Sequence, residues 1–145
     1  MIKKTEKSLK QAQEQIEELT SKWKRAVADY HNLEKRVREE KTEFVKFANA
    51  GLLDKLLEVL DDLERAEVHL KNKGLSLILS QFRSVLNTEG IREIKALKTK
   101  FDPETMDCVE MVIGPKNRVM EIVGKGYFLN NKVLRPAKVK VGKGG

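Results

Sequence analysis

The sequence predicts an α+β protein with a long N-terminal helix, two short helices and a small C-terminal β domain. Three observations support this class. Apolar residues recur at heptad spacing through the first third of the chain, a broader apolar band follows, and short β-rich runs occupy the last third. Charged residues make up 35% of the chain and aromatic residues only 6%, which suits helices that expose most of their surface.

The first predicted element is a continuous helix over residues 2–48, which contain neither proline nor glycine. With Ile2 at heptad position a, every a position is apolar, and most d positions are apolar or small. The predicted seam residues are Leu9, Ile16, Leu19, Trp23, Tyr30, Leu33 and Val37. Because one narrow stripe on so long a helix needs a partner, residues 1–50 are predicted to form a parallel dimeric coiled-coil stalk. Polar Thr5 and Glu40 at d positions predict an uneven seam that melts early.

The second predicted element is a pair of short helices over residues 51–89. The apolar band between residues 52 and 71 is too wide for a two-stranded seam. Asn72-Lys73-Gly74 is expected to break the helix, and Gly90 is expected to be the C′ residue of the next one. Two such helices from each chain of a dimer predict a dimeric four-helix bundle, in which both apolar faces are buried.

The third predicted element is a small β domain over residues 90–145. Glycine, proline and asparagine separate short β-rich runs, which fall at residues 108–113, 119–123, 126–129, 133–134 and 137–141. Asp102 and Pro103 have the pattern of an N-cap followed by the first residue of a helical turn. Cys108 lies in an apolar run and is predicted to be a small core residue.

The sequence does not group residues in the patterns that catalysis or metal binding requires. His31 and His69 lie on different predicted helices without ligand spacing. Asp61-Asp62 and Glu39-Glu40 are interpreted as solvated helix faces with i,i+4 pairing. Gly124-Lys125-Gly126 lacks the further glycine and the helix of a phosphate-binding loop. The chain is therefore predicted not to be an enzyme and to need no metal or cofactor.

The charge pattern and the single cysteine limit the partners and the cellular compartment that we expect. The net charge of +7 comes from 29 basic and 22 acidic side chains, which are spread along the sequence. Because no dense basic run stands out, specific nucleic-acid binding is not expected. One cysteine cannot form an internal disulfide, and neither a membrane-spanning run nor a signal peptide is recognisable. We therefore expect a soluble cytoplasmic protein with no membrane partner.

The last third of the chain carries a set of residues with a distinctive spacing: Phe101, Asp102, Pro103, Gly126, Tyr127, Arg135, Pro136 and Ala137. In residue type and spacing this set resembles the signature of the GrpE family, the nucleotide exchange factors of DnaK-type heat-shock chaperones. Residues 29–36 resemble the cluster on the family's stalk, and residues 60–66 resemble its first bundle helix. The similarity covers about residues 25–141.

The resemblance implies a function without chemistry of its own. A homodimer would dock on the ATPase domain of one DnaK-type chaperone, open its cleft and release ADP, so that ATP rebinds and the substrate is released. The stalk would lead toward the chaperone's substrate-binding domain. A rival interpretation is a non-enzymatic coiled-coil tether or adaptor whose β head binds some other protein.

By position, the resemblance implies chaperone contacts for Asn32, Lys35, Arg36, Phe47, Lys132 and Val141. Each of these residues has a structural alternative. Phe47 lies at a d position and can belong to the seam, Val141 can belong to the β core, and Lys35 and Arg36 can be solvated charges. The signature residues of the β domain are expected to be mostly architectural, since a buried aromatic ring or a fixed turn explains them without a partner.

Overall fold

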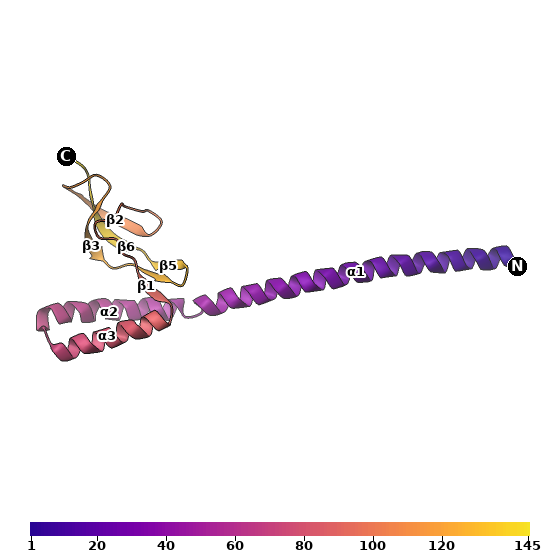
Figure 1. Ribbon diagram of the computed structural model, residues 1–145, viewed down its shortest axis with the longest axis horizontal. Coiled ribbons are helices and arrows are strands. Elements are labelled where there is room, and N and C mark those ends of the chain that lie inside the picture. Colours follow the sequence, from indigo (N-terminus) through magenta and orange to yellow (C-terminus); the bar gives the residue numbers. More distant parts are fainter. The chain divides into compact units, whose positions relative to one another are not determined.

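The computed structural model describes all 145 residues, which divide into two compact units, Met1–Val45 and Lys46–Gly145. Helix α1 (Ile2–Phe47), which Figure 1 shows as one unbroken helix, makes up the first unit, and its last two residues, Lys46 and Phe47, belong to the second. The 46 residues of α1 span roughly 69 Å at about 1.5 Å per residue. The predicted continuous N-terminal helix is confirmed, and so is the α+β class of the chain.

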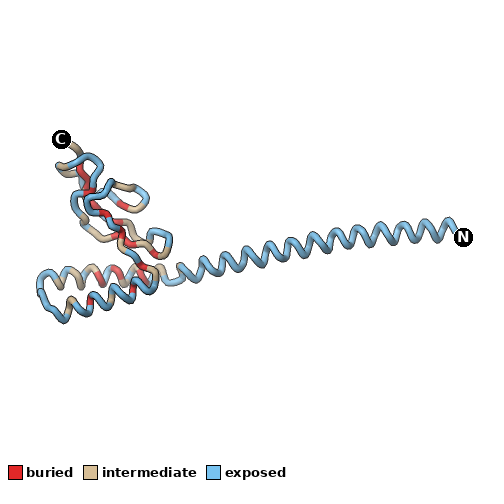
Figure 2. The backbone as a smooth tube through the Cα atoms, viewed as in Figure 1, coloured by how far each residue is buried: buried red, intermediate tan, exposed pale blue.

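The heptad stripe of α1 is exposed along its whole length. Leu9, Ile16, Trp23 and Tyr30 each leave between 60% and 64% of their surface open to solvent. No residue of this helix is buried, as the pale blue tube of Figure 2 shows. The stripe is therefore free to pack against another helix, while the dimeric seam itself stays a prediction.

Two shorter helices, α2 (Ala50–Leu70) and α3 (Lys73–Thr88), form a helical hairpin at the start of the second unit (Figure 1). The side chain of Asn72 caps α3 by accepting a hydrogen bond from the N–H of Gly74 at 2.8 Å. Lys73 and Gly74 therefore belong to α3, and the predicted break over residues 72–74 is too long. The cap satisfies the first free N–H groups of the helix, so a shorter turn is enough.

Gly90 ends the helical hairpin as predicted. It follows α3 with a φ of 91°, and its N–H donates to the carbonyl of Asn87 at 3.1 Å. A Cβ atom at this position would overlap the side-chain amide of Asn130, which comes from the β region. Glycine is thus required here both by the backbone conformation and by the close approach of a distant turn.

The β region contains six strands in two three-stranded sheets. The strands are β1 (Ile91–Glu93), β2 (Met106–Val112), β3 (Val119–Gly124), β4 (Tyr127–Leu129), β5 (Lys132–Arg135) and β6 (Ala137–Gly142). One sheet has the order β1-β4-β5 and is antiparallel. In the other, β6 lies between β2, with which it is parallel, and β3, with which it is antiparallel. Strand β1 was not predicted, because three residues show no period.

Two clusters of buried side chains hold the second unit together. The first cluster joins the helices to one sheet and contains Leu53, Leu57, Leu60, Leu79, Leu86, Ile91, Tyr127 and Leu129. The second fills the other sheet and contains Ile94, Ala96, Met106, Val119, Ala137, Val139 and Val141. The red segments of Figure 2 mark both clusters. Since helices and strands share the first cluster, the predicted boundary at residue 90 runs through a common core, and the domain boundaries stay predictions.

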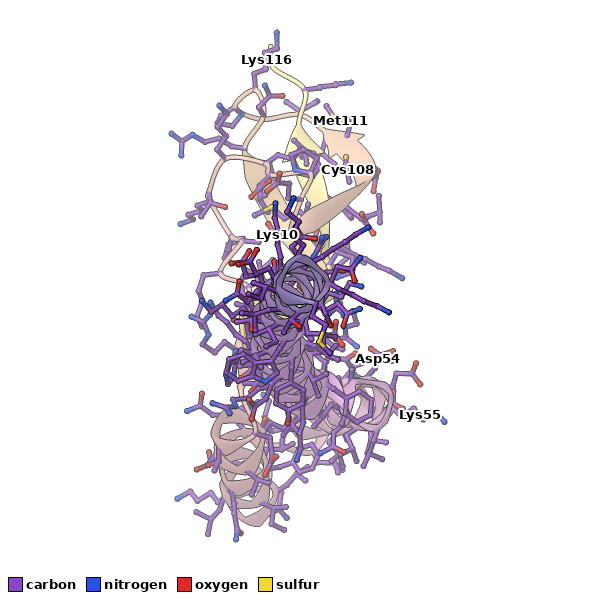
Figure 3. All side chains as sticks on the ribbon, turned by 90° about the vertical axis from the view of Figure 1, so that its right-hand side faces the viewer. Lys10, Asp54, Lys55, Cys108, Met111 and Lys116 are labelled. Carbon is purple, nitrogen blue, oxygen red and sulfur yellow. The ribbon has the colours of Figure 1, made fainter.

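Cys108 is exposed, so its predicted place in the core is wrong. It lies on β2, an edge strand whose pairing with β6 shifts register between Cys108 and Glu110. Met106 is the only buried residue of β2, so this edge strand contributes its first residue to the core and leaves Cys108 outside it. The thiol instead lies beside Met111 on the surface, with 3.6 Å between the two sulfur atoms (Figure 3).

None of the helices combines the length and the apolar character that crossing a bilayer requires.

Candidate functional site

The turn between β4 and β5 contacts the C-terminal end of α1. The side chain of Asn130, whose φ is 53°, donates a hydrogen bond to the carbonyl of Lys46 at 3.1 Å. The ammonium group of Lys132 lies 4.5 Å from the centroid of the Phe47 ring, in the arrangement of a cation–π contact. Two of the predicted chaperone contacts, far apart in the sequence, are therefore neighbours.

Arg135 fastens the β region to helix α2. Its guanidinium forms a bidentate ion pair with Asp61, with N–O distances of 2.8 and 3.1 Å. Two of its N–H groups also donate to the carbonyl of Lys125, at 3.0 and 2.7 Å. The guanidinium lies 5.2 Å from the ring of buried Tyr127, whose pKa is raised mainly by burial. The arrangement fixes β4 and β5 against the helix.

Glu64 forms a second fastening, one turn further along α2. Its carboxylate pairs with Arg83 of α3 at 2.8 Å and with Lys125 of the β region at 3.0 Å. Burial is the largest influence on the pKa of Glu64 and raises it, but hydrogen bonds and charges from both cations outweigh burial and lower the pKa. The pKa of Arg83 is raised, chiefly by its hydrogen bond to Glu64. The ionised network links α2, α3 and the β region.

Asp61 and Glu64 were not recognised from the sequence as residues that hold the fold together. The i,i+4 interpretation of Asp61-Asp62 holds in neither position, because Asp61 pairs across the fold with Arg135, and Asp62 pairs with Arg65 at i,i+3. Asp61 and Glu64 follow Leu57 by four and seven residues, so they lie on the same helix face as the core leucines. An acidic residue within the apolar face of a helix is the sequence signal that could have identified Asp61 and Glu64.

The predicted stalk contacts lie on the exposed surface of α1. Asn32, Lys35 and Arg36 are all exposed. Lys35 faces Glu39 at 4.0 Å and Arg36 faces Glu40 at 3.8 Å, both at i,i+4 on the solvated helix. Weak surface pairs of this kind leave the two cations available to another protein.

Val141 differs from the other predicted contacts because it is buried. Only 2% of its surface is exposed, and it packs in the core of the second sheet. The Val141 side chain is therefore not exposed for the predicted chaperone contact in this chain, and its position fits the alternative of a core residue.

The signature residues of the β domain lie in turns and cores. Phe101 packs against the second core, and Asp102 accepts a hydrogen bond from the N–H of Glu104 at 3.0 Å, just before the turn at residues 103–105. A Cβ atom at Gly126 would overlap the backbone at Pro136 and Ala137, so the two segments can approach only without a side chain there. Their role in binding stays untested.

Together these features define a protein that acts by binding other proteins: a helix with an exposed apolar stripe, and a braced β region with cations on its surface. The comparisons with known proteins identify the family to which it belongs. The family model of GrpE matches residues 1–143. The GrpE protein of Methanosphaera stadtmanae is 40% identical over 136 residues, which cover 89% of this chain and 79% of that protein. Those of Brachyspira hyodysenteriae and Bacteroides fragilis are 35% and 34% identical, over 94% and 97% of this chain and 75% and 78% of their own lengths.

The chain belongs to the GrpE family. It is a nucleotide exchange co-chaperone of DnaK-type chaperones, and the resemblance stated from the sequence is confirmed. Family membership does not favour the rival interpretation of a tether.

Proposed function

We propose that the chain acts as a homodimer that docks the surface around Lys132 and Phe47 on the ATPase domain of its chaperone. Docking opens the nucleotide cleft, ADP leaves, and ATP then binds. The observation that carries this proposal is the stacking of Lys132 on Phe47 at 4.5 Å, where the β4–β5 turn meets the end of α1.

This surface is suited to a charged partner. Lys132 is exposed, and no carboxylate of the chain lies within ion-pair distance of its ammonium group. Phe47 is half-buried and gives the lysine a fixed apolar neighbour. Asn130 holds the turn against the helix end through its bond to Lys46. Because the groups are already in place, little ordering is needed when an acidic partner surface binds.

The fastening of the β region explains how docking can open a cleft. The bidentate pair of Arg135 with Asp61 and the network around Glu64 keep the β region and the helices together. A braced surface fits one shape of its partner better than another. If that shape is the open conformation of the ATPase domain, the difference in affinity shifts the chaperone toward it and speeds nucleotide release.

The homodimer is supported by apolar surface that the single chain leaves open. On α1 the stripe of heptad residues is exposed. On the hairpin, Leu52, Val59, Leu77 and Ile78 leave between 51% and 72% of their surfaces open. Burying a leucine or valine side chain contributes about 1.5–3 kcal/mol, so pairing of two chains gains much from these faces. A parallel coiled coil continued by a four-helix bundle is the arrangement proposed, and the cytoplasmic location stays a prediction.

The proposal is tested by stopped-flow release of fluorescent ADP from a DnaK-type ATPase domain. The wild-type chain should accelerate release strongly. Lys132→Glu should reduce the acceleration roughly tenfold or more, because it places a like charge against an acidic partner surface. Lys138→Glu, at another exposed lysine, on β6, is the matched control and should leave release unchanged. Equal loss in both variants would show that net charge, and not this surface, governs docking.

A further inference from the structure

Three loops meet at one end of the β2-β6-β3 sheet. The N–H of Asn117 donates to the carbonyl of Gly142 at 3.0 Å, and the N–H of Phe101 donates to the carbonyl of Asn117 at 2.8 Å. Lys100 and Arg118 are partners in an isolated β-bridge. The segments 98–100, 115–118 and 142–144 are thus neighbours, although they lie far apart in the sequence. Figure 3 shows Lys116 at this end of the β region.

Five exposed cations gather on these loops, and we call them the tip cluster: Lys98, Lys100, Lys116, Arg118 and Lys143. None lies within ion-pair distance of a carboxylate. Of the three acids of the sheet, Asp107, Glu110 and Glu121, the two glutamates are engaged by Lys140, at 3.4 and 3.2 Å. The carboxylate of Asp102 accepts a hydrogen bond from the backbone of Glu104.

The backbone holds these cations close together despite their repulsion. The Arg118 guanidinium donates to the carbonyl of Lys98 at 3.1 Å. Lys98 and Asn117 have positive φ values of 62° and 59°, a backbone conformation that residues other than glycine adopt at a cost. Like charges gathered on a small surface raise the local positive potential, and an anionic partner would relieve it.

We propose that the tip cluster binds an acidic segment of a protein partner. Exposed apolar residues lie close to the cations along the chain: Leu97 precedes Lys98, and Ile113 lies three residues before Lys116, with 52% and 77% of their surfaces open. Mixed cationic and aliphatic surface suits a peptide that carries carboxylates. The aromatic ring of this end, Phe101, packs against the core and offers no platform for stacking a nucleic-acid base.

The tip cluster is separate from the surface proposed for docking. Lys132 lies on β5, in the other sheet, where the β4–β5 turn meets the end of α1. The cluster lies at the end of the sheet that holds β6, near the C-terminus (Figure 1). The inference therefore does not rest on the proposed docking surface.

Fluorescence anisotropy of the full-length chain with a labelled short peptide of alternating glutamate and alanine tests the inference. The tip variant changes Lys98, Lys100, Lys116 and Lys143 to glutamine and keeps Arg118, which supports a backbone carbonyl. The stalk variant changes Lys3, Lys4, Lys7 and Lys10 to glutamine, so it loses the same charge elsewhere. Far-UV circular dichroism checks that each variant keeps its fold, and a milder pair, Lys116→Gln with Lys143→Gln, serves if the tip variant does not.

The wild-type chain should bind the acidic peptide more tightly as salt is lowered. The tip variant should lose roughly tenfold or more in affinity, and the milder pair should lose less in the same direction. The stalk variant should stay within about twofold of the wild type. The inference is wrong if the peptide does not bind or if both variants lose equally. It is also wrong if a DNA duplex binds more tightly than the peptide and loses its affinity in the tip variant.

Discussion

Replacing Arg135 by alanine should loosen the β region from the helices. The Arg135 side chain is only 21% exposed, and the change removes the bidentate pair with Asp61 together with both hydrogen bonds to the carbonyl of Lys125. Asp61, whose side chain is 29% exposed, is left without its cation. The contact with the Tyr127 ring is lost as well.

The magnitude follows from how far these groups are from water. Hydrogen bonds to charged groups contribute about 1.5–3 kcal/mol, and breaking a fully buried ion pair costs about 3–5 kcal/mol. Because water reaches part of the Asp61 side chain, we expect Arg135→Ala to lower the free energy of opening by about 2–3 kcal/mol, less than the loss of a fully buried ion pair would. At about 1.4 kcal/mol for each factor of ten, this loss corresponds to an opening equilibrium roughly 30- to 150-fold more favourable.

Hydrogen exchange measured by mass spectrometry on peptides covering β4 to β6 reports this opening. Arg65→Ala is the control, because it removes an arginine that pairs with Asp62 on the exposed surface of the same helix. The control should change exchange by less than about 0.5 kcal/mol. Adding Asp61→Asn to Arg135→Ala should recover part of the loss, since no charge is left unpaired. Equal effects of the two arginine substitutions would refute the proposed fastening.

Two further predictions concern pH and heat. The lowered pKa of Glu64 means that its ionised form stabilises the fold; this contribution is complete above its ordinary value of 4.5 and is lost as pH falls through the lower folded value. Glu64→Gln should therefore flatten the fall of the urea midpoint below pH 4.5, whereas Glu58→Gln, an exposed glutamate of the same helix, should not. On heating, fluorescence of Trp23, the single tryptophan, should change before the circular dichroism of the β region, at a temperature that rises with protein concentration. One coincident, concentration-independent transition would exclude a dimeric stalk that melts first.

The parts of the fold that are periodic along the chain could be predicted from the sequence. The helix from Ile2 to Phe47, the Asn72 break and the Gly90 terminus follow from local spacing and capping chemistry. The predicted strand positions were also close to those in the structure. The parallel pairing of β2 with β6 and the three-residue β1 depend on contacts between distant segments, which no local pattern encodes.

The candidate site was predictable only where single residues matched a family. That match pointed to Phe47 and Lys132, but not to their contact, because the β4–β5 turn reaches the helix end only after the fold closes. Glu64 and Asp61 were missed because an acid on a helix is normally solvated, and only their place on the leucine face indicates otherwise. Val141 shows the reverse, a predicted contact that packs in the core.

The central place of β6 constrains how the protein is made. Of the six strands, β6 is made after the other five, yet it lies between β2 and β3 and supplies the buried residues Ala137, Val139 and Val141. Until β6 has been made, β2 and β3 lack the strand that lies between them, whereas α1 needs only neighbouring turns to form. The nascent chain should therefore become helical first and acquire its second sheet only after residues 137–142 have been synthesised. A premature stop before Ala137 would leave a helical protein whose β2 and β3 lack the strand that joins them.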